Sequence, residues 1–340
     1  MHINRFQILI KMEIHEIKLE ELVVKDFVDS WVDRIRHAIG QEYAINALSG
    51  GVDSSVVTML GHEALGNQLL TVFIDNGLMR EGEPENIVSI FQRLGVPVKL
   101  QDAQEQFFNA LKGLTDPEKK REAITQTFYK DVFGKLVRES SAKYLMQGTN
   151  YTDIKETVAG IKRQHNVLEQ LGIDTQQEFG YKVIEPLIQI RKPAIRKVAE
   201  YLGLPEEIYN RMPFPGPALA TRIIGEVTPE KVNIVRKATR IVEGIIEDTS
   251  LNANLDSKPF QYLAILHEDR VTGIVDGKRN FGYQIEVRCW DSKDAVTAKP
   301  TRLPYDALCK IANRITTEIP EVVSVTYSVS SKPPSTIEAI

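Results

Sequence analysis

The sequence predicts an α/β protein in which a parallel-sheet domain is followed by a smaller α+β domain. Up to about residue 200, short unbroken apolar runs alternate with helical patterns. Strands of a parallel sheet read as unbroken apolar runs because helices cover both faces of the sheet. Beyond Met212-Pro-Phe-Pro-Gly-Pro217, strands and helices follow without strict alternation, so this segment marks the expected domain boundary. The chain of 340 residues is long enough for about two domains.

The first domain is expected at 41–212, after an N-terminal helical segment at 1–40 whose apolar residues recur at helical spacing up to Gly40. A polar stretch without a clean period, near 155–181, is expected to be a lid or binding loop. Apolar runs predict strands at 43–48, 69–74, 96–100, 142–146 and 183–187. Helices are predicted at 54–60, 83–94, 103–112, 117–139 and 193–202.

The second domain is expected at 213–340. Two strongly periodic segments, 229–247 and 305–318, predict its helices. Strands are predicted at 261–266, 270–275, 284–289 and 322–328.

The composition excludes several classes of function. Lys and Arg number 42 against 46 Asp and Glu, and no basic stripe is visible, so we expect no nucleic-acid partner. No apolar run approaches the roughly 18 residues that span a bilayer, so we expect no membrane partner. The two cysteines, Cys289 and Cys309, cannot form a disulfide framework. We expect packed free thiols, which suit a cytoplasmic location.

The most informative segment is the loop Ser49-Gly-Gly-Val-Asp-Ser-Ser55, between a predicted strand and a predicted helix. This position lies at the carboxyl edge of a parallel sheet, where such folds bind ligands. Two glycines let the backbone approach an anion, and the amides of the loop and of the helix start attract phosphate. Asp53 suits such a site if Mg²⁺ bridges it to phosphate, so it is the predicted metal ligand. The alternative is a strand-to-helix turn that uses glycine only for geometry.

The string Ser-Gly-Gly-x-Asp-Ser resembles the signature of the N-type ATP pyrophosphatases. Members of that family have an adenine nucleotide alpha hydrolase-like fold and cleave ATP between its α- and β-phosphates. Further strings resemble the GMP synthetase branch of the family and occur in its order. They lie at 72–78, 114–121, 147–156, 161–167, 213–228, 279–283 and 330–338.

This resemblance implies ATP-dependent amidation of XMP to GMP through an adenylyl-XMP intermediate, with Mg²⁺ required and AMP and pyrophosphate released. The implied ATP and pyrophosphate site contains Ser49, Gly50, Gly51, Val52, Asp53, Ser54, Ser55, Asp75 and Gly148. The implied XMP site contains Arg222, Arg270, Lys332, Thr336, Ile337 and Glu338. The implied catalytic residues are Asp153, Glu156, Lys162 and His165. Judged by their spacing alone, Asp153 and Glu156 share one helix face and either serve the site or form a solvated helix start.

The resemblance also implies a homodimer formed by the second domain. No segment resembles a glutaminase, which needs a cysteine nucleophile in a tight glycine turn. Ammonia is therefore expected either free or from a separate glutamine amidotransferase subunit. The segment Gln164–Leu171 and the tail Thr336-Ile-Glu-Ala-Ile340 depart from the family's usual strings. They leave open adenylation of a different acceptor, or a non-catalytic nucleotide-binding paralogue.

Overall fold

The structure is a computed structural model, and it describes residues 14–158, 181–248, 259–275, 277–293 and 295–339. In these ranges no helix has both the length and the apolar character needed to cross a membrane.

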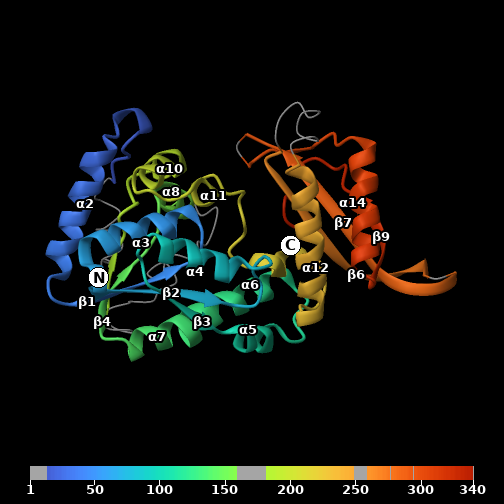
Figure 1. The fold of residues 1–340 in the computed structure, drawn as a ribbon, viewed down its shortest axis with the longest axis horizontal. Helices are drawn as coiled ribbons and strands as arrows, with labels where there is room; N and C mark the ends of the chain where they lie inside the picture. Colours follow the sequence, from blue (N-terminus) through green and yellow to red (C-terminus); the bar gives the residue numbers. More distant parts are fainter. Residues whose placement is uncertain (1–13, 159–180, 249–258, 276, 294, 340) are drawn as a thin grey trace, which may run out of the picture. The chain divides into compact units, whose positions relative to one another are not determined.

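The chain divides into two compact units, and each is built from more than one stretch of sequence (Figure 1). The first unit contains Met1–Ile74, Ile87–Gln101 and Phe133–Arg211. The second contains Asp75–Asn86, Asp102–Val132 and Met212–Ile340.

A five-stranded sheet with the order β3-β2-β1-β4-β5 organises the first unit. Strand β1 pairs in parallel with β2 on one side and with β4 on the other, and β4 pairs in parallel with β5. The chain moves outward from β1 to β3 and then returns to β4 on the other side of β1, so a topological switch point lies between β1 and β4. The strands are β1 (Tyr43–Leu48), β2 (Leu69–Asp75), β3 (Val98–Asp102), β4 (Ala142–Met146) and β5 (Lys182–Ile184).

Helices cover this sheet because its strands are apolar on both faces. Helix α3 has an almost entirely buried apolar stripe, including Val56, Val57 and Leu60, and it contacts α2 and α10. Helix α7 lies on the other side of the strands (Figure 1). The main helices of this part of the chain are α2 (Val24–Ile39), α3 (Val52–Leu65), α4 (Glu83–Arg93), α7 (Gly134–Glu139), α8 (Tyr151–Val158) and α10 (Lys192–Tyr201). Short turns of helix are η1 (Leu19–Glu21), η2 (Gly66–Gln68) and α11 (Glu206–Tyr209).

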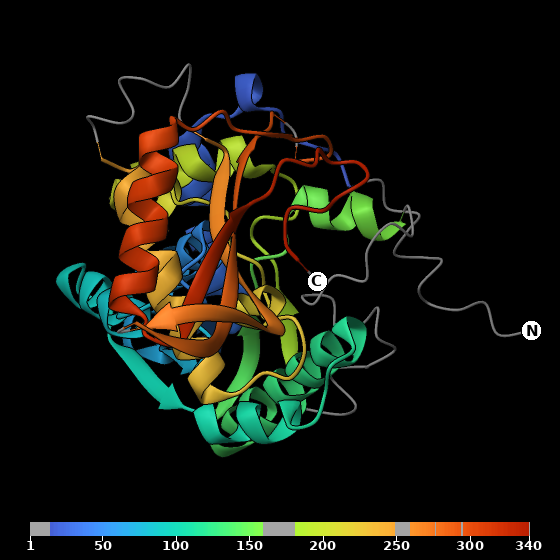
Figure 2. The same cartoon turned by 90° about the vertical axis from the view of Figure 1, so that its right-hand side faces the viewer.

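A four-stranded sheet organises the second unit. Strands β6 and β7 form a long antiparallel hairpin, and β7 also pairs with β8 and, in parallel, with β9 (Figure 2). Helix α12 packs on β6, helix α14 packs on β9, and the two helices contact each other. The elements are α5 (Gln104–Leu111), α6 (Pro117–Gln126), η3 (Thr127–Phe133), η5 (Ala218–Arg222), α12 (Pro229–Ile246), β6 (Gln261–Val275), β7 (Lys278–Asp291), β8 (Lys299–Pro300), α14 (Tyr305–Glu318) and β9 (Val322–Tyr327).

The fold class predicted from the sequence is confirmed: a parallel five-stranded α/β part precedes a smaller part built on a mainly antiparallel sheet. Strands β1 and β4 and helix α14 have the predicted limits. The predicted strands 261–266 and 270–275 are one strand, β6, with a register shift between Leu266 and Arg270. The predicted helix 117–139 is divided into α6, a π-helical turn and α7.

Helices α5 and α6 belong to the second unit, although the sequence analysis placed them in the domain at 41–212. The amide of Gly113 donates to Glu226 Oε1 at 2.7 Å, and Lys120 Nζ donates to the carbonyl of Ile223 at 2.9 Å. These bonds attach α5 and α6 to the segment that follows the proline-rich stretch. Such long-range partners leave no trace in local periodicity.

Candidate active site

The loop between β1 and α3 is folded by its own serines. Ser54 Oγ accepts from the Ser49 amide at 3.1 Å and donates to the Gly51 carbonyl at 3.1 Å. Gly50 has φ +74°, a left-handed conformation that favours glycine. Gly51 is the N-cap residue of α3 and has no side chain that could accept a hydrogen bond from the start of the helix. The first amides of an α-helix have no partner within the helix. These amides and the helix dipole make the loop suitable for an anion.

The loop after β4 presses against the loop after β1. A Cβ atom at Gly148 would lie 3.1 Å from the Cβ of Asp53 and 3.2 Å from both the Asp53 carbonyl carbon and the Ser54 amide nitrogen. Only glycine fits there without displacing the start of α3. The two carboxyl ends that flank the switch point therefore meet, and Gly148 is in contact with the predicted phosphate loop.

The carboxylate of Asp53 is held on one side and bare on the other. Its Oδ2 forms an ion pair with Lys192 Nζ and accepts from Asn150 Nδ2 at 3.4 Å. Its Oδ1 is buried and has no hydrogen-bond partner among the described residues. A bare, buried carboxylate oxygen is costly, and a bound cation would satisfy it.

This donor set fits Mg²⁺ that arrives with a nucleotide. Within the described ranges, no group of three or more His, Cys, Asp or Glu side chains could hold a metal ion. Mg²⁺ commonly uses one or two carboxylates together with the phosphates of its substrate. Asp53 supplies one such carboxylate beside a loop suited to phosphate.

Three residues of this site were not predicted from the sequence: Lys192, Asn150 and Arg211. Lys192 begins α10, and Arg211 Nη1 donates to the Gly50 carbonyl at 3.1 Å. A basic residue directly before Pro193, at the start of the predicted helix 193–202, was the only sequence signal for Lys192. Arg211 had no signal, because its partner lies 161 positions away.

The predicted catalytic residue Asp153 caps helix α8. Its Oδ2 accepts from the Asn150 amide at 3.0 Å, and the Asn150 side chain accepts from the amides of Thr152 and Asp153 at 2.9 and 3.3 Å. This reciprocal cap fixes Asn150, whose amide group reaches Asp53. Glu156 lies on α8, but its side chain is outside the described structure. Lys162 and His165 lie outside the described residues.

Asp75, predicted in the ATP and pyrophosphate site, ends β2 and belongs to the second unit. Its Oδ1 accepts from the Gly77 amide at 2.8 Å, and its Oδ2 accepts from Gln104 Nε2 at 2.7 Å. Arg236 donates to the carbonyls of Gly77 and Met79 at 2.7 and 2.9 Å. The turn after β2 is thus fixed by side chains of α5 and α12.

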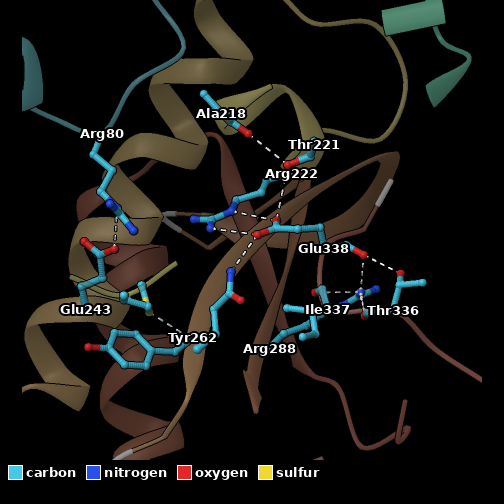
Figure 3. A network of polar contacts seen from close by, with 12 residues as sticks. Arg80, Ala218, Thr221, Arg222, Glu243, Tyr262, Arg288, Thr336, Ile337 and Glu338 are labelled. Atoms are coloured by element: carbon cyan, nitrogen blue, oxygen red, sulfur yellow. Dashed lines mark hydrogen bonds and ion pairs between the residues drawn. The ribbon is translucent and has the colours of Figure 1, made fainter. Parts of the chain in front are cut away.

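A buried arginine and the carboxylate of the tail form the core of a polar network in the second unit (Figure 3). Arg222 is fully buried, and its Nε and Nη2 donate to the two oxygens of Glu338 at 3.1 and 3.2 Å. Gln261 Nε2 donates to Glu338 Oε1 at 2.8 Å, and Thr221 Oγ1 donates to Glu338 Oε2 at 3.4 Å. Arg222 Nη1 is buried and has no partner among the described residues. One nitrogen of this guanidinium therefore remains available as a donor.

A second ion pair lies beside the first. Arg80 Nε is 3.0 Å from Glu243 Oε1, and burial raises the pKa of Glu243 even though Arg80 acts against the shift. The ring of Phe214 contacts both cations, at 4.2 Å from the Arg80 guanidinium and 5.0 Å from that of Arg222. These contacts hold the proline-rich segment against the network.

The other predicted acceptor residues fall into two groups. Ile337 packs into a buried apolar cluster, and Thr336 Oγ1 donates to the Glu338 carbonyl at 2.6 Å, so both lie with Glu338. The Arg270 guanidinium instead lies 3.4 Å from the centre of the Tyr283 ring. Lys332 Nζ donates to the Ala295 carbonyl at 2.6 Å.

Fold and loop together define a nucleotide-binding α/β protein with its phosphate loop at the switch point of a parallel sheet. Residues 23–216 match the family model described as NAD synthase, and residues 248–339 match that of the GMP synthase C terminal domain.

Comparison with known proteins narrows this class. The chain is 50% identical to a glutamine-hydrolysing GMP synthase subunit of Archaeoglobus fulgidus over 315 residues, which cover 93% of this chain and 99% of that protein. It is 45% identical to the corresponding subunit of Methanopyrus kandleri, covering 92% of this chain and 98% of that protein. It is also 45% identical to the corresponding subunit of Pyrococcus abyssi, covering 92% of this chain and 98% of that protein. The chain belongs to the family of these GMP synthase subunits, which confirms the resemblance found in the sequence.

Proposed function

We propose that this protein is an ATP-dependent amidating ligase that converts XMP, ammonia and ATP into GMP, AMP and pyrophosphate. The observation that carries the proposal is the serine-folded glycine loop with Asp53 at the β1/β4 switch point. Its relatives are GMP synthases by name, and they match this chain over nearly its whole length.

The chemistry explains why ATP is needed. The oxygen on C2 of the xanthine ring is a poor leaving group. Attack of that oxygen on the α-phosphorus of ATP forms the adenylyl-XMP bond and releases pyrophosphate. Ammonia then adds to C2, and AMP departs with the former xanthine oxygen. The enzyme must orient the phosphates, offset their charge and exclude water from the adenylate.

The first unit supplies groups for the phosphates of ATP. The amides at the start of α3 and the hydroxyl group of Ser49 are donors suited to the pyrophosphate that leaves. Mg²⁺ held by Asp53 would offset negative charge on the phosphate oxygens. Lys192, paired with Asp53, adds a second cation beside the loop. Asn150 and Gly148 keep the Asp53 carboxylate in place.

The second unit supplies groups for the acceptor. The xanthine ring carries N–H donors, and the Glu338 carboxylate is a hydrogen-bond acceptor. Arg222 already gives two N–H groups to Glu338 and is fully buried. We therefore assign to Arg222 the orientation of this carboxylate, rather than contact with the monophosphate alone.

Partners follow from the same assignment. The name of the relatives, as one subunit of a glutamine-hydrolysing enzyme, implies a separate glutamine amidotransferase subunit, which would supply the ammonia. We also propose a homodimer formed through the second unit, and a cytoplasmic location. Light scattering of the purified protein measures the homodimer directly, and a monomer at working concentration would contradict it.

The decisive experiment follows the oxygen atom. XMP labelled with ¹⁸O at the C2 oxygen is incubated with ammonium, Mg²⁺ and ATP, and the products are separated and analysed by mass spectrometry. We expect equal amounts of GMP, AMP and pyrophosphate, with the label in AMP. Formation of ADP and orthophosphate, or label retained in the purine, would overturn the mechanism.

Two further arms separate the alternatives. Pyrophosphate release that depends on a non-purine compound instead of XMP would show that another acceptor is adenylated. Tight ATP binding without turnover against any acceptor would identify a non-catalytic paralogue.

A further inference from the structure

The backbone of the tail that carries Glu338 is contacted by the guanidinium of Arg288 on strand β7. Arg288 Nη1 donates to three successive carbonyls of the tail: those of Thr336 at 2.8 Å, Ile337 at 3.4 Å and Glu338 at 3.2 Å. Figure 3 shows Arg288 beside this stretch of backbone. Three converging carbonyl dipoles form a favourable environment for one cation. The contact fixes the main chain without using the side chains of the tail.

The Arg288 guanidinium is itself oriented by a carboxylate on the same strand. Arg288 Nε donates to Glu286 Oε1 at 2.7 Å, and the other oxygen of Glu286 is 2.9 Å from His267 Nε2. Glu286 and Arg288 are two positions apart on β7 and therefore face the same side of the sheet. Burial alone would raise the pKa of Glu286, but the hydrogen bonds from Arg288 and His267 outweigh it and lower the pKa.

The side chain of Ile337 anchors the same stretch by apolar contact. It is buried in a cluster with Leu263, Ile265, Trp290 and Ala298. Leu263 is the cross-strand neighbour of Arg288, and Ile265 is the cross-strand neighbour of Glu286. The apolar anchor and the carbonyl clamp therefore act on the same face of the hairpin.

We propose that Arg288 is the positioning residue of the acceptor site. By holding three carbonyls it sets the backbone path that presents Glu338 to Arg222, Gln261 and Thr221. Glu286 and His267 hold the Arg288 guanidinium in the orientation that reaches the carbonyls of the tail. This inference rests on the proposed function, because it assigns the tail to the acceptor, but the clamp itself is a property of the protein without substrate.

The kinetic test compares two substitutions at Arg288. Arg288→Lys keeps the charge but loses the planar fork that reaches Glu286 and the tail together. Arg288→Met removes both the charge and the fork. We expect the KM for XMP to rise about 10- to 100-fold in Arg288→Met, as for loss of charged hydrogen bonds, and less in Arg288→Lys. The KM for ATP should stay within about twofold. Equal rises in both KM values would overturn the proposal.

The matched control is Arg314→Met. Arg314 also pairs through its Nε with a carboxylate, that of Glu318 at 2.6 Å, but it lies on the surface of α14. Its replacement should leave both KM values unchanged. Glu286→Gln provides a second, milder variant: it keeps the shape of the side chain but weakens its hold on Arg288, and the same XMP-selective rise is expected. A rise for Arg314→Met as large as for Arg288→Met would refute the specific role.

A spectroscopic test needs no turnover. Trp290 is buried against Ile337, and Trp31→Phe leaves it as the single tryptophan. In that background Arg288→Met should shift Trp290 emission to the red and increase its quenching by acrylamide, while Arg314→Met should not. Unchanged emission and quenching would overturn the clamp even if XMP is the substrate. Altered emission in a protein that does not convert XMP would support the clamp and reject the proposed acceptor.

Discussion

Gly148 offers the most direct test of the joint between the two loops at the switch point. An alanine Cβ there would meet the Asp53 Cβ at 3.1 Å and backbone atoms of Asp53 and Ser54 at 3.2 Å. Backbone atoms cannot rotate away, so the start of α3 must move by a few tenths of an ångström. Overpacking of this kind costs about 1–3 kcal/mol of the free energy of unfolding. A 1 Å misplacement costs roughly 10²-fold in rate, so turnover should fall about three- to tenfold.

The assay combines urea unfolding with the rate of pyrophosphate release. Gly244→Ala is the matched control, because Gly244 lies in helix α12 and a Cβ there would meet no atom within 4 Å. That variant should gain about 0.5–1 kcal/mol from the better helix propensity of alanine. If Gly148→Ala were as stable and as active as the unchanged protein, the two loops would not press on each other as described.

Three further results are expected. Asp53→Ala should abolish pyrophosphate release but change the free energy of unfolding by less than about 1 kcal/mol, as for a partly exposed ion pair; retained activity would refute its role with Mg²⁺. Burial lowers the pKa of Lys120 from 10.5 to about 8, so the unfolded chain binds more protons between these values and stability rises with pH there. Lys120→Met should remove this rise of about 3 kcal/mol, whereas replacing the exposed Lys119 should not; identical pH profiles would contradict the assignment. Burial raises the pKa of Cys289 to about 12, so iodoacetamide at pH 8 should modify Cys309 first. Mass spectrometry of the native protein measures the order, and modification of Cys289 first would contradict this expectation.

Much of the fold could be predicted because its signals are local. A mainly apolar run bounded by turn residues predicted both limits of β1 and of β4. The polar segment His267-Glu-Asp269 hid the continuity of β6, because it coincides with the register shift that lets the strand carry polar groups. The π-helical turn η3 was not predicted because its side-chain pattern differs little from that of an α-helix.

The site was predictable where a single loop defines it and not where distant segments meet. The segment Ser49–Ser55 contains its own glycines and hydroxyl groups, so its chemistry can be read directly. Arg222 was predicted in the XMP site, but its partner Glu338 lies 116 positions away and satisfies two of its donors. Arg288 had no distinctive local signal, because polar residues occupy every second position of the predicted strand 284–289, and Lys192 had only its place before a proline.

The interleaved make-up of the second unit affects how the chain is synthesised and how it can be divided. Helices α5 and α6 leave the ribosome well before the segment around Ile223, whose carbonyl accepts the hydrogen bond from Lys120. At roughly 5–20 residues per second, the ribosome needs several seconds to add the residues that separate these helices from their hydrogen-bond partners. In a protein cut between 212 and 213, helices α5 and α6 would lie on a different polypeptide from their hydrogen-bond partners. Chimaeras made between relatives must therefore exchange all three stretches of this unit at once.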